Sequence, residues 1–356
     1  MLLFDAHLDL SMNAIEYNRD LTRPLDEVRQ REQGMTDKID RGKNVLTFEE
    51  MRRGKMGLCV ATQIGRYVAL DNPLPGWHSP EIAWSITQAQ LAWYREMERI
   101  GQLVAIVDRD GLNRHVELWK DNPPDDAPIG YILSLEGADS IVTFDHLQRA
   151  YEYGLRAIGP AHYGAGRYAP GTGVEGGLEA DGPALLKEMQ QLGMILDATH
   201  LTDEGFWQAL EIFDGPIWAS HSNCRAIVPY QRQFNDDQLK ALIERGAVIG
   251  AAFDAWMMYP DGWVRGKTIP EESGVKIEWI VDHIDHICQL AGNARHSGIG
   301  SDLDGGYGFE QTPLDLKSVA ELQRLTTILA DRGYSQNDIE GFMHGNWIRF
   351  LNEAWQ

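Results

Sequence analysis

Short apolar runs alternate along the chain with longer segments in which hydrophobic residues recur at helical spacing. Most of the short runs are almost continuously apolar, which is typical of parallel strands whose outer face is covered by helices. Eight runs are expected as strands: Leu2–Ala6, Gly57–Gln63, Tyr131–Leu135, Leu155–Ala161, Met194–Thr199, Pro216–Ser220, Ala247–Phe253 and Gly298–Ser301. Eight strands that alternate with helices predict an α/β protein with a (β/α)₈ TIM-barrel fold.

The segments between these runs contain the expected helices, among them Pro80–Ile100, Gly182–Leu192, Asp203–Ile212, Asp236–Arg245 and Lys276–Ala291. Gly193 and Gly246 each follow a helical pattern and precede an apolar run, as expected where a helix ends. The stretch from about residue 10 to residue 54 is polar and shows no clear strand. We therefore expect a helical or loop insertion after the first strand, and extra helices at the C-terminal end.

The size and composition of the chain suit one large barrel. It has 356 residues, of which 43% are hydrophobic, enough to bury a substantial core. No internal repeat, low-complexity tract or linker interrupts the pattern. We therefore expect residues 1–356 to form a single (β/α)₈ domain.

Charge and cysteine content narrow the choice of partners and compartment. Asp and Glu outnumber Lys and Arg by 53 to 32, a formal charge of −21, which repels nucleic acid and anionic membranes. Cys59, Cys224 and Cys288 form neither a disulfide framework nor a thiolate zinc site. The start, MLLFDAHLDL, lacks the basic region of a signal peptide, and no segment has the length of a membrane span. A cytoplasmic location is expected.

His7 and Asp9 stand two residues apart at the end of the first apolar run. Side chains at positions i and i+2 point to the same side of a strand. An imidazole and a carboxylate therefore converge, which suits two ligands of one divalent metal. The pair is a weak signal alone, because His-x-Asp is common by chance.

Residues of the types that bind metals follow six of the eight runs: His7 and Asp9, Glu136, His162, His200, His221 and Asp302. Only the second and seventh runs end without one. The catalytic groups of TIM barrels lie at the carboxyl ends of the strands. A single buried histidine or capping carboxylate is usually structural, but seven ionisable groups around one cavity are costly to desolvate without a cation. The pattern therefore predicts a metal site.

The ligand types indicate the metal. Three of these histidines (His7, His200 and His221) and two of the carboxylates (Asp9 and Glu136), with no thiolate, favour zinc ahead of manganese, cobalt or iron. Five ligands exceed the needs of one catalytic zinc ion, and they suit two ions that share a carboxylate and a hydroxide. Glu136 is expected to be that shared ligand, because its strand lies between the side of His7 and Asp9 and the side of His200 and His221.

The chain resembles the renal, or membrane, dipeptidase family of zinc metallopeptidases, which belongs to the amidohydrolase-like barrels. The resemblance spans most of the sequence and rests on DAHLDL, SLEGAD, YGLRAIGPAH, LGMILDATH, ASHSNCRAI, YQRQFNDD, HIDHICQLAG, GIGSDLDGG and HGNWIRF. It implies one zinc ion on His7, Asp9 and Glu136. It implies a second on Glu136, His200 and His221.

The resemblance also implies roles for three further residues. His162 would polarise the substrate, Arg232 would bind its terminal carboxylate, and Asp302 would be the general acid and base. In the chemistry that we expect, a hydroxide shared by two zinc ions attacks the scissile carbonyl. Asp302 then passes the proton to the departing amine. From position alone, Arg232 is as well explained as a solvated loop residue.

Two segments depart from the family pattern. After His162 the chain places Tyr163, Arg167 and Tyr168, where relatives tend to be Asn-containing and less basic. Tyr163 is expected to contact substrate, and Arg167 is expected at the surface. The segment AAFDAWMMYP replaces an Asn-Phe-Tyr type of segment, and its residues 256–259 are expected to pack under a loop rather than line a pocket.

Other motifs are interpreted as structural. His283 and His286 have helical spacing and are expected to pack outside the barrel. Ser220 and Ser222 flank His221 without the strand-turn-helix context of a serine nucleophile. Cys224 is expected to be a small packing residue.

The sequence thus predicts a dipeptidase with a binuclear zinc site that cleaves dipeptides with a free C-terminal carboxylate, of L-Xaa-L-Xaa and L-Xaa-D-Xaa type. A homodimer is compatible with the resemblance. The first alternative is another metal-dependent amidohydrolase, acting on an N-acyl amino acid, a cyclic amide or a lactone. Many such barrels carry His-x-His and a bridging modified lysine, and this chain has neither at the corresponding strand ends. The second alternative is a non-catalytic metal-binding barrel, against which Asp302 and His162 argue.

Overall fold

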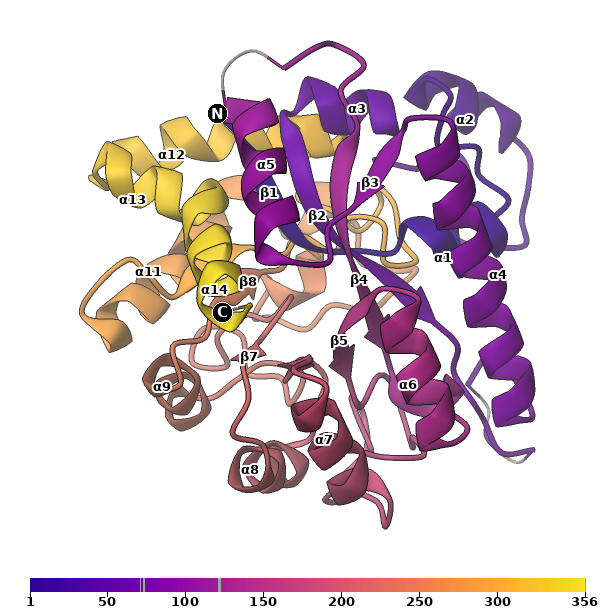
Figure 1. The fold of residues 1–356 in the computed structure, drawn as a ribbon. Helices are drawn as coiled ribbons and strands as arrows, with labels where there is room; N and C mark the ends of the chain where they lie inside the picture. The colour runs from indigo at the N-terminus through magenta and orange to yellow at the C-terminus, as the bar shows by residue number, and fades with distance from the viewer. Residues whose placement is uncertain (71, 73, 121–122, 356) are drawn as a thin grey trace.

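The computed structural model describes residues 1–356 except 71, 73, 121, 122 and 356. Parallel strands form one sheet that curves into a barrel, with helices around it (Figure 1). The strands are β1 (Leu3–Leu8), β2 (Met56–Ile64), β3 (Leu103–Ala105), β4 (Ile129–Glu136), β5 (Leu155–Gly159), β6 (Ile195–Asp197), β7 (Ile217–Trp218), β8 (Ile249–Ala251) and β9 (Ser297–Ile299). Each of the eight expected runs overlaps one of these strands.

The barrel is closed between β7 and β8. Eight strands follow one another in the order β7-β6-β5-β4-β2-β1-β9-β8. Ala219, directly after β7, bridges Ile249 of β8. Its amide donates to the carbonyl of Val248 at 3.1 Å, and its carbonyl accepts from the amide of Gly250 at 2.8 Å. The predicted (β/α)₈ barrel is therefore confirmed, with the three-residue strand β3 added beside the first half of β4.

The helices lie mostly on the outside of the barrel (Figure 1). They are α1 (Leu10–Ile15), α2 (Leu25–Arg31), α3 (Phe48–Arg53), α4 (Pro80–Arg99), α5 (Arg109–Lys120), α6 (Phe144–Glu152), α7 (Gly182–Gln191), α8 (Asp203–Ile212), α9 (Asp236–Glu244), α10 (Pro270–Ser273), α11 (Ile280–Ala291), α12 (Leu325–Asp331), α13 (Gln336–Glu340) and α14 (Asn346–Ala354). Short 3₁₀ helices span Ala138–Ser140, Ala255–Met257, Ile277–Trp279 and Val319–Arg324, and a π-helix spans Gly341–Gly345. The insertion after β1 contains α1 to α3, and α12 to α14 are the expected C-terminal helices.

The strands are buried on both faces because side chains also fill the inside of the barrel. One apolar cluster takes residues from seven strands or their ends and from α14: Phe4, Ala6, Leu58, Val60, Ile132, Ala157, Ile195, Trp218, Val248, Trp347, Phe350 and Leu351. Strands on different sides of a barrel share only its interior, so this cluster fixes their positions relative to one another. The strand ends, and the side chains that follow them, are thereby held rigidly.

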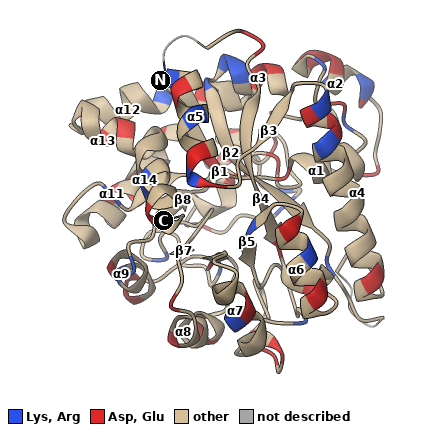
Figure 2. Ribbon diagram, viewed as in Figure 1, with Lys and Arg blue, Asp and Glu red and all other residues tan. Residues whose placement is uncertain are grey.

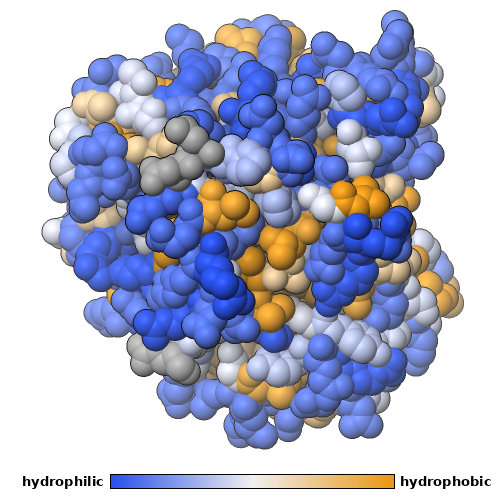
Figure 3. Space-filling view, turned by 45° about the horizontal axis from the view of Figure 1, so that its top comes forward, coloured by the Kyte–Doolittle hydropathy of each residue, from blue (hydrophilic) through white to orange (hydrophobic). Residues whose placement is uncertain are grey.

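The surface is polar. Acidic and basic residues lie along the outer helices (Figure 2), and hydrophobic residues form only scattered groups on the face drawn in Figure 3.

All three cysteines are buried and unpaired. Within the described part of the chain, no helix is both long enough and apolar enough to cross a bilayer.

Candidate active site

The seven side chains predicted to form the site come from the carboxyl ends of the barrel strands. His7 lies in β1 and Glu136 ends β4, and the others follow their strands within a few residues: Asp9 after β1, His162 after β5, His200 after β6, His221 after β7 and Asp302 after β9. Six of the seven line one cavity. The seventh, His7, is buried and lies 3.5 Å from Glu136. The structure therefore brings all seven together.

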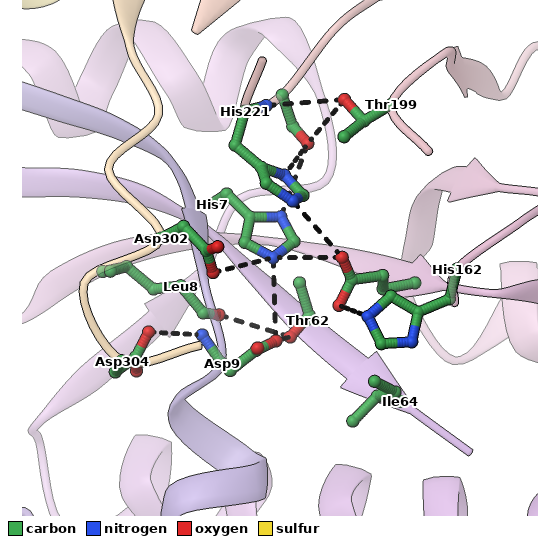
Figure 4. A network of polar contacts seen from close by, with 12 residues as sticks. His7, Leu8, Asp9, Thr62, Ile64, His162, Thr199, His221, Asp302 and Asp304 are labelled. Carbon is green, nitrogen blue, oxygen red and sulfur yellow. Dashed lines mark hydrogen bonds and ion pairs between the residues drawn. The ribbon is translucent and has the colours of Figure 1, made fainter. Parts of the chain in front are cut away.

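Glu136 occupies the centre of this group. Its Oε1 atom lies 3.2 Å from Nε2 of His200 and 3.5 Å from Nε2 of both His7 and His221. Its Oε2 atom lies 3.7 Å from Nε2 of His162. In Figure 4 the labelled His7, His162 and His221 point toward one centre from three sides. One carboxylate thus connects the β1 side of the barrel with the β6 and β7 side.

His200 and His221 are held with their Nε2 atoms facing inward. Nδ1 of His221 lies 2.9 Å from Oγ of Ser220, and Nδ1 of His200 lies 2.8 Å from Oγ1 of Thr172. The two Nε2 atoms are 3.2 Å apart. Burial, as the largest cause, lowers the pKa of both imidazoles well below the usual value. Neutral imidazoles with Nδ1 engaged direct their Nε2 lone pairs at the centre, as metal ligands do.

His7 is surrounded by carboxylates. Its Nε2 atom lies 3.5 Å from Glu136, 3.8 Å from Asp9 and 3.9 Å from Asp302, yet it has no hydrogen-bond partner among the described residues. Burial lowers the pKa of His7, but these carboxylates outweigh burial and raise it to about 10. The ligand atoms of His7, Asp9 and Glu136 all lie within 4.8 Å of one another. An unsatisfied buried nitrogen amid excess negative charge fits a divalent cation.

Asp9 is positioned by two neighbours. Its backbone amide donates to Oδ1 of Asp304 at 2.8 Å, and the hydroxyl of Thr62 donates to its Oδ1 atom. Burial, together with the charge of Glu136, raises the pKa of Asp9 to about 7. A cation at this position would favour the charged carboxylate. Asp304 and Thr62 therefore hold the backbone and the carboxylate of Asp9 in place.

His162 is fixed by Arg66, which follows β2. The guanidinium of Arg66 donates a hydrogen bond to Nδ1 of His162. Arginine has no acceptor and stays protonated, so Nδ1 must be the acceptor and the ring proton lies on Nε2. Burial, with Arg66 among the further causes, lowers the pKa of His162 to about 3. His162 therefore presents a neutral N–H donor to the cavity, although it lies close enough to Glu136 and His200 to suggest a ligand.

Two residues of the site adopt left-handed backbone conformations. Asp302 has φ 59° and His200 has φ 70°. Such conformations are uncommon outside glycine and cost about 1–3 kcal/mol each.

Burial raises the pKa of Asp302 well above its usual value, and the charges of Asp9 and Glu136 raise it further. Asp302 thus carries a carboxyl group that can hold a proton beside the centre.

Arg232 brings an uncompensated positive charge into the cavity. It is 5% exposed, and its guanidinium donates to the carbonyl of His221 at 2.8 Å and to Oγ of Ser222 at 3.4 Å. No carboxylate of the described residues lies within 4.0 Å of it. A buried cation is costly without an anionic partner. Its position in the cavity therefore fits an anionic ligand group.

The cavity at the centre has a volume of about 330 Å³ and extends along the side of β7, β8 and β9. A second cavity of about 530 Å³ lies on the side of β1 and β2 and includes Arg66. Both are lined by Asp9, His162 and Tyr163. Tyr163 is 37% exposed, and its ring stands edge-on to His162 at 5.0 Å. Asp9, His162 and Tyr163 therefore lie where the two cavities meet, and Glu136, His200 and His221 line the smaller cavity.

Several charged residues of these cavities were missed in the sequence, among them two that follow barrel strands. Arg66 follows β2 and Asp254 follows β8, the two strands that were expected to end without a site residue. Each stands directly after an apolar run, and this position is the signal that the sequence offered. Neither residue indicates a metal site, because arginine does not bind metals and FDAW has no obvious metal-ligand spacing.

The expectation for residues 256–259 was wrong in part. Trp256 and Met257 line the smaller cavity. Met258 is buried, and Tyr259 packs against the core, as expected. Arg167 is half-buried rather than at the surface, and it donates to the carbonyl of Ile141 at 2.7 Å, so its contacts are structural.

The fold and the site define a class, namely TIM barrels with metal-type ligands at their strand ends. The model of the membrane dipeptidase family, peptidase family M19, matches residues 1–356. The chain belongs to the membrane dipeptidase family. This family is one of dipeptidases.

Two relatives are similar to somewhat less than two thirds of this chain. A protein of Klebsiella pneumoniae, the uncharacterized protein in the pqqA 5′ region, is 32% identical over 246 residues, which cover 65% of this chain and 84% of that protein. An uncharacterized dipeptidase of Schizosaccharomyces pombe is 30% identical over 226 residues, or 62% of this chain and 52% of the yeast protein. The match thus spans about half of the yeast relative.

A solved structure shares the fold. The metallopeptidase from Rhodobacter sphaeroides, liganded with a phosphinate mimic of the dipeptide L-Ala-D-Ala, has a TM-score of 0.80. The likeness covers 100% of this chain and 99% of that chain at 22% identity. At 22% identity, this likeness shows that the two proteins share the barrel fold.

Proposed function

We propose that the protein is a zinc-dependent dipeptidase that hydrolyses L-Xaa-L-Xaa and L-Xaa-D-Xaa dipeptides with a free C-terminal carboxylate. The position of Arg232 carries the proposal, because this buried cation lines the same cavity as Glu136. The planar guanidinium is suited to bind a carboxylate through two hydrogen bonds. The phosphinate dipeptide mimic bound by the structural relative supports this substrate class.

The ligand set fits two zinc ions. His7, Asp9 and Glu136 would hold one ion, and Glu136, His200 and His221 would hold the other. Nitrogen and oxygen ligands without thiolate suit catalytic zinc. The partnerless Nε2 atom of His7 supports a cation at this place. When bound, the ions would make water nucleophilic near neutral pH and polarise the scissile carbonyl.

The remaining residues of the site bind substrate and move protons. Arg232 binds the C-terminal carboxylate and so places the scissile bond near Glu136. His162 donates a hydrogen bond from Nε2 to the carbonyl oxygen, where negative charge develops. Asp302 accepts the proton of the attacking water and transfers it to the amine nitrogen as the C–N bond breaks. Tyr163 covers the substrate at the junction of the two cavities.

The direct test combines metal analysis with a substrate panel. The purified protein is assayed on L-Xaa-L-Xaa and L-Xaa-D-Xaa dipeptides, on C-terminally amidated dipeptides and on N-acyl amino acids, before and after chelation. We expect zinc in the protein, cleavage of free dipeptides, loss on chelation and recovery with zinc. Cleavage of N-acyl amino acids alone would favour the amidohydrolase alternative. Metal binding without any cleavage would favour the non-catalytic barrel.

Three further points complete the proposal. The match of one family model and one closed barrel to the chain supports a single catalytic domain over residues 1–356. The cytoplasmic location and the homodimer stay predictions from the sequence.

A further inference from the structure

Asp254 is a carboxylate in the catalytic cavity that the proposed reaction does not use. It lies three residues after the end of β8, is 5% exposed and lines the 330 Å³ cavity together with Arg232 and Asp302. Asp254 is therefore placed where it could contact a substrate bound to Arg232.

The side chain of Asp254 is held by hydrogen bonds, and the charged residue that acts on it, Arg265 of the same cavity, does not form an ion pair with it. Nε2 of Gln311 donates to both of its oxygens, at 3.0 and 2.9 Å, and the amide of Trp256 donates to Oδ1 at 3.3 Å. No Lys, Arg or His nitrogen of the described residues lies within 4.0 Å of it. Burial raises its pKa to about 7. A cation beside this carboxylate would favour its charged form.

The walls around Asp254 suit a positively charged group. Trp256, Trp263 and Tyr307 line the same cavity. Tyr307 is 2% exposed, and its hydroxyl, whose oxygen can accept a hydrogen bond from an ammonium or guanidinium group, has no hydrogen-bond partner among the described residues. A carboxylate beside aromatic rings binds ammonium and guanidinium groups through an ion pair and cation–π contacts.

The position of Asp254 on the barrel assigns it to one end of the substrate. β8 lies between β7 and β9, and the amide of Phe253 donates to the carbonyl of Ser301, next to Asp302, at 2.9 Å. Arg232 follows β7 and lines the same cavity, whereas the other cavity lies toward β1 and β2. A dipeptide with its carboxylate on Arg232 therefore places its C-terminal residue, and not its N-terminal residue, beside Asp254.

We propose that Asp254, held by Gln311, forms a subsite for a cationic side chain, an ammonium or a guanidinium, on the C-terminal residue of the substrate. This inference rests on the proposed dipeptidase function. It names the substrate class as dipeptides that end in a basic residue such as lysine, ornithine or arginine.

The first test is the substrate preference of the zinc-loaded protein. Dipeptides with one N-terminal residue and C-terminal Lys, Met or Glu, in both L and D forms, are compared by kcat/KM. Met approximates the length of Lys without its charge. We expect Lys to exceed Met at least about tenfold and Glu to be the poorest of the three. Equal values for Lys and Met, or a preference for Glu through the exposed Arg265 at the same cavity, would overturn the proposal.

The second test is the variant Asp254→Asn, with Asp261→Asn as the control. Asp261 is exposed on the same connection, does not line either cavity, and loses the same charge on substitution. We expect the Lys/Met ratio to fall to about one in D254N and to keep its value in D261N. A ratio within one variant cancels differences in folding or metal content. An unchanged ratio in D254N would refute the role of Asp254.

A binding measurement separates this inference from the proposed function. Calorimetry compares free lysine with free methionine on the zinc-loaded wild type and on D254N. Binding of lysine at least about tenfold tighter, lost in D254N, supports the subsite even if no dipeptide is cleaved. Cleavage of the Met dipeptide without any preference for lysine would refute the Asp254 subsite but not the proposed dipeptidase function. Failure to cleave any dipeptide would refute the proposed function. The calorimetric comparison of lysine with methionine would then test the Asp254 subsite by itself.

Discussion

The guanidinium of Arg66 donates a hydrogen bond to Nδ1 of His162, across the junction of the two cavities. This contact places the ring proton of His162 on Nε2, the nitrogen nearest Glu136. A donor that is fixed before substrate arrives needs no reorganisation when charge develops on the carbonyl oxygen. Arg66 is thus a positioning residue for the proposed reaction.

Replacing Arg66 by Met removes this contact. We expect kcat to fall about 10- to 100-fold, because a misplaced donor stabilises the transition state less, while KM and zinc content change little. ¹⁵N NMR of His162 should show the loss of the single Nε2–H tautomer. Arg99→Met, on the exposed end of α4, is the control. An unchanged kcat together with an altered tautomer would refute the role of the Nε2 proton.

Replacing Asp302 by Asn keeps the size of the side chain but removes its ability to accept a proton. We expect kcat to fall about 10²- to 10⁴-fold, the usual contribution of a general acid or base. The zinc content should stay at the wild-type level, because Asp302 is not among the proposed ligands. Elemental analysis and steady-state kinetics on the same preparation check both points. Loss of zinc together with activity would make Asp302 a ligand instead.

Replacing Arg232 by Met should raise KM for free dipeptides about 10- to 100-fold, since a hydrogen bond to a charged group contributes about 1.5–3 kcal/mol. Amidated dipeptides lack the carboxylate and should therefore be poor substrates of the wild type and of the variant alike. Kinetics with the free and the amidated form of one dipeptide test this directly. Equal losses on both forms would show that Arg232 acts on the fold and not on the carboxylate.

His283 on α11 provides a pH test away from the site. It is buried, its Nδ1 accepts from the amide of Cys224 at 3.1 Å, and burial lowers its pKa to about 3. Below pH 6.5 this histidine binds a proton in the unfolded chain but stays neutral in the folded chain. The free energy of unfolding therefore falls as the pH falls. Asn can accept the same hydrogen bond without titrating.

We therefore expect His283→Asn to gain stability relative to wild type by about 2 kcal/mol between pH 6.5 and pH 5, at about 1.4 kcal/mol per pH unit. Chemical unfolding of the two proteins at each pH, both without metal, measures the difference. A difference that does not vary with pH would contradict the buried neutral histidine.

The strand ends were predictable because parallel buried strands leave continuous apolar runs, and the site residues stand directly after them. His7, Glu136 and His221 could be placed together in this way, since the barrel brings every strand end to one face. The strand β3 was missed because three residues show no periodicity. Its position beside β4 depends on pairing that only the folded chain provides.

Other features of the site depend on contacts between distant segments. The proton position on His162 is set by Arg66, which lies on a different strand end. Asp254 is buried, and both of its carboxylate oxygens accept from Gln311, a residue 57 positions further along the chain. The left-handed backbone of Asp302 is likewise imposed by the surrounding fold. Such relations leave no pattern in the sequence.

The central claim is that Glu136 joins two halves of one zinc centre that hydrolyses dipeptides. Zinc titration into the chelated protein, with bound metal and dipeptide hydrolysis followed in parallel, tests it most directly. We expect hydrolysis to rise with bound zinc and to level off at about two ions per chain, and we expect Glu136→Gln to bind less than one ion and to stay inactive. Full hydrolysis without bound metal, or undiminished zinc binding in Glu136→Gln, would contradict this claim.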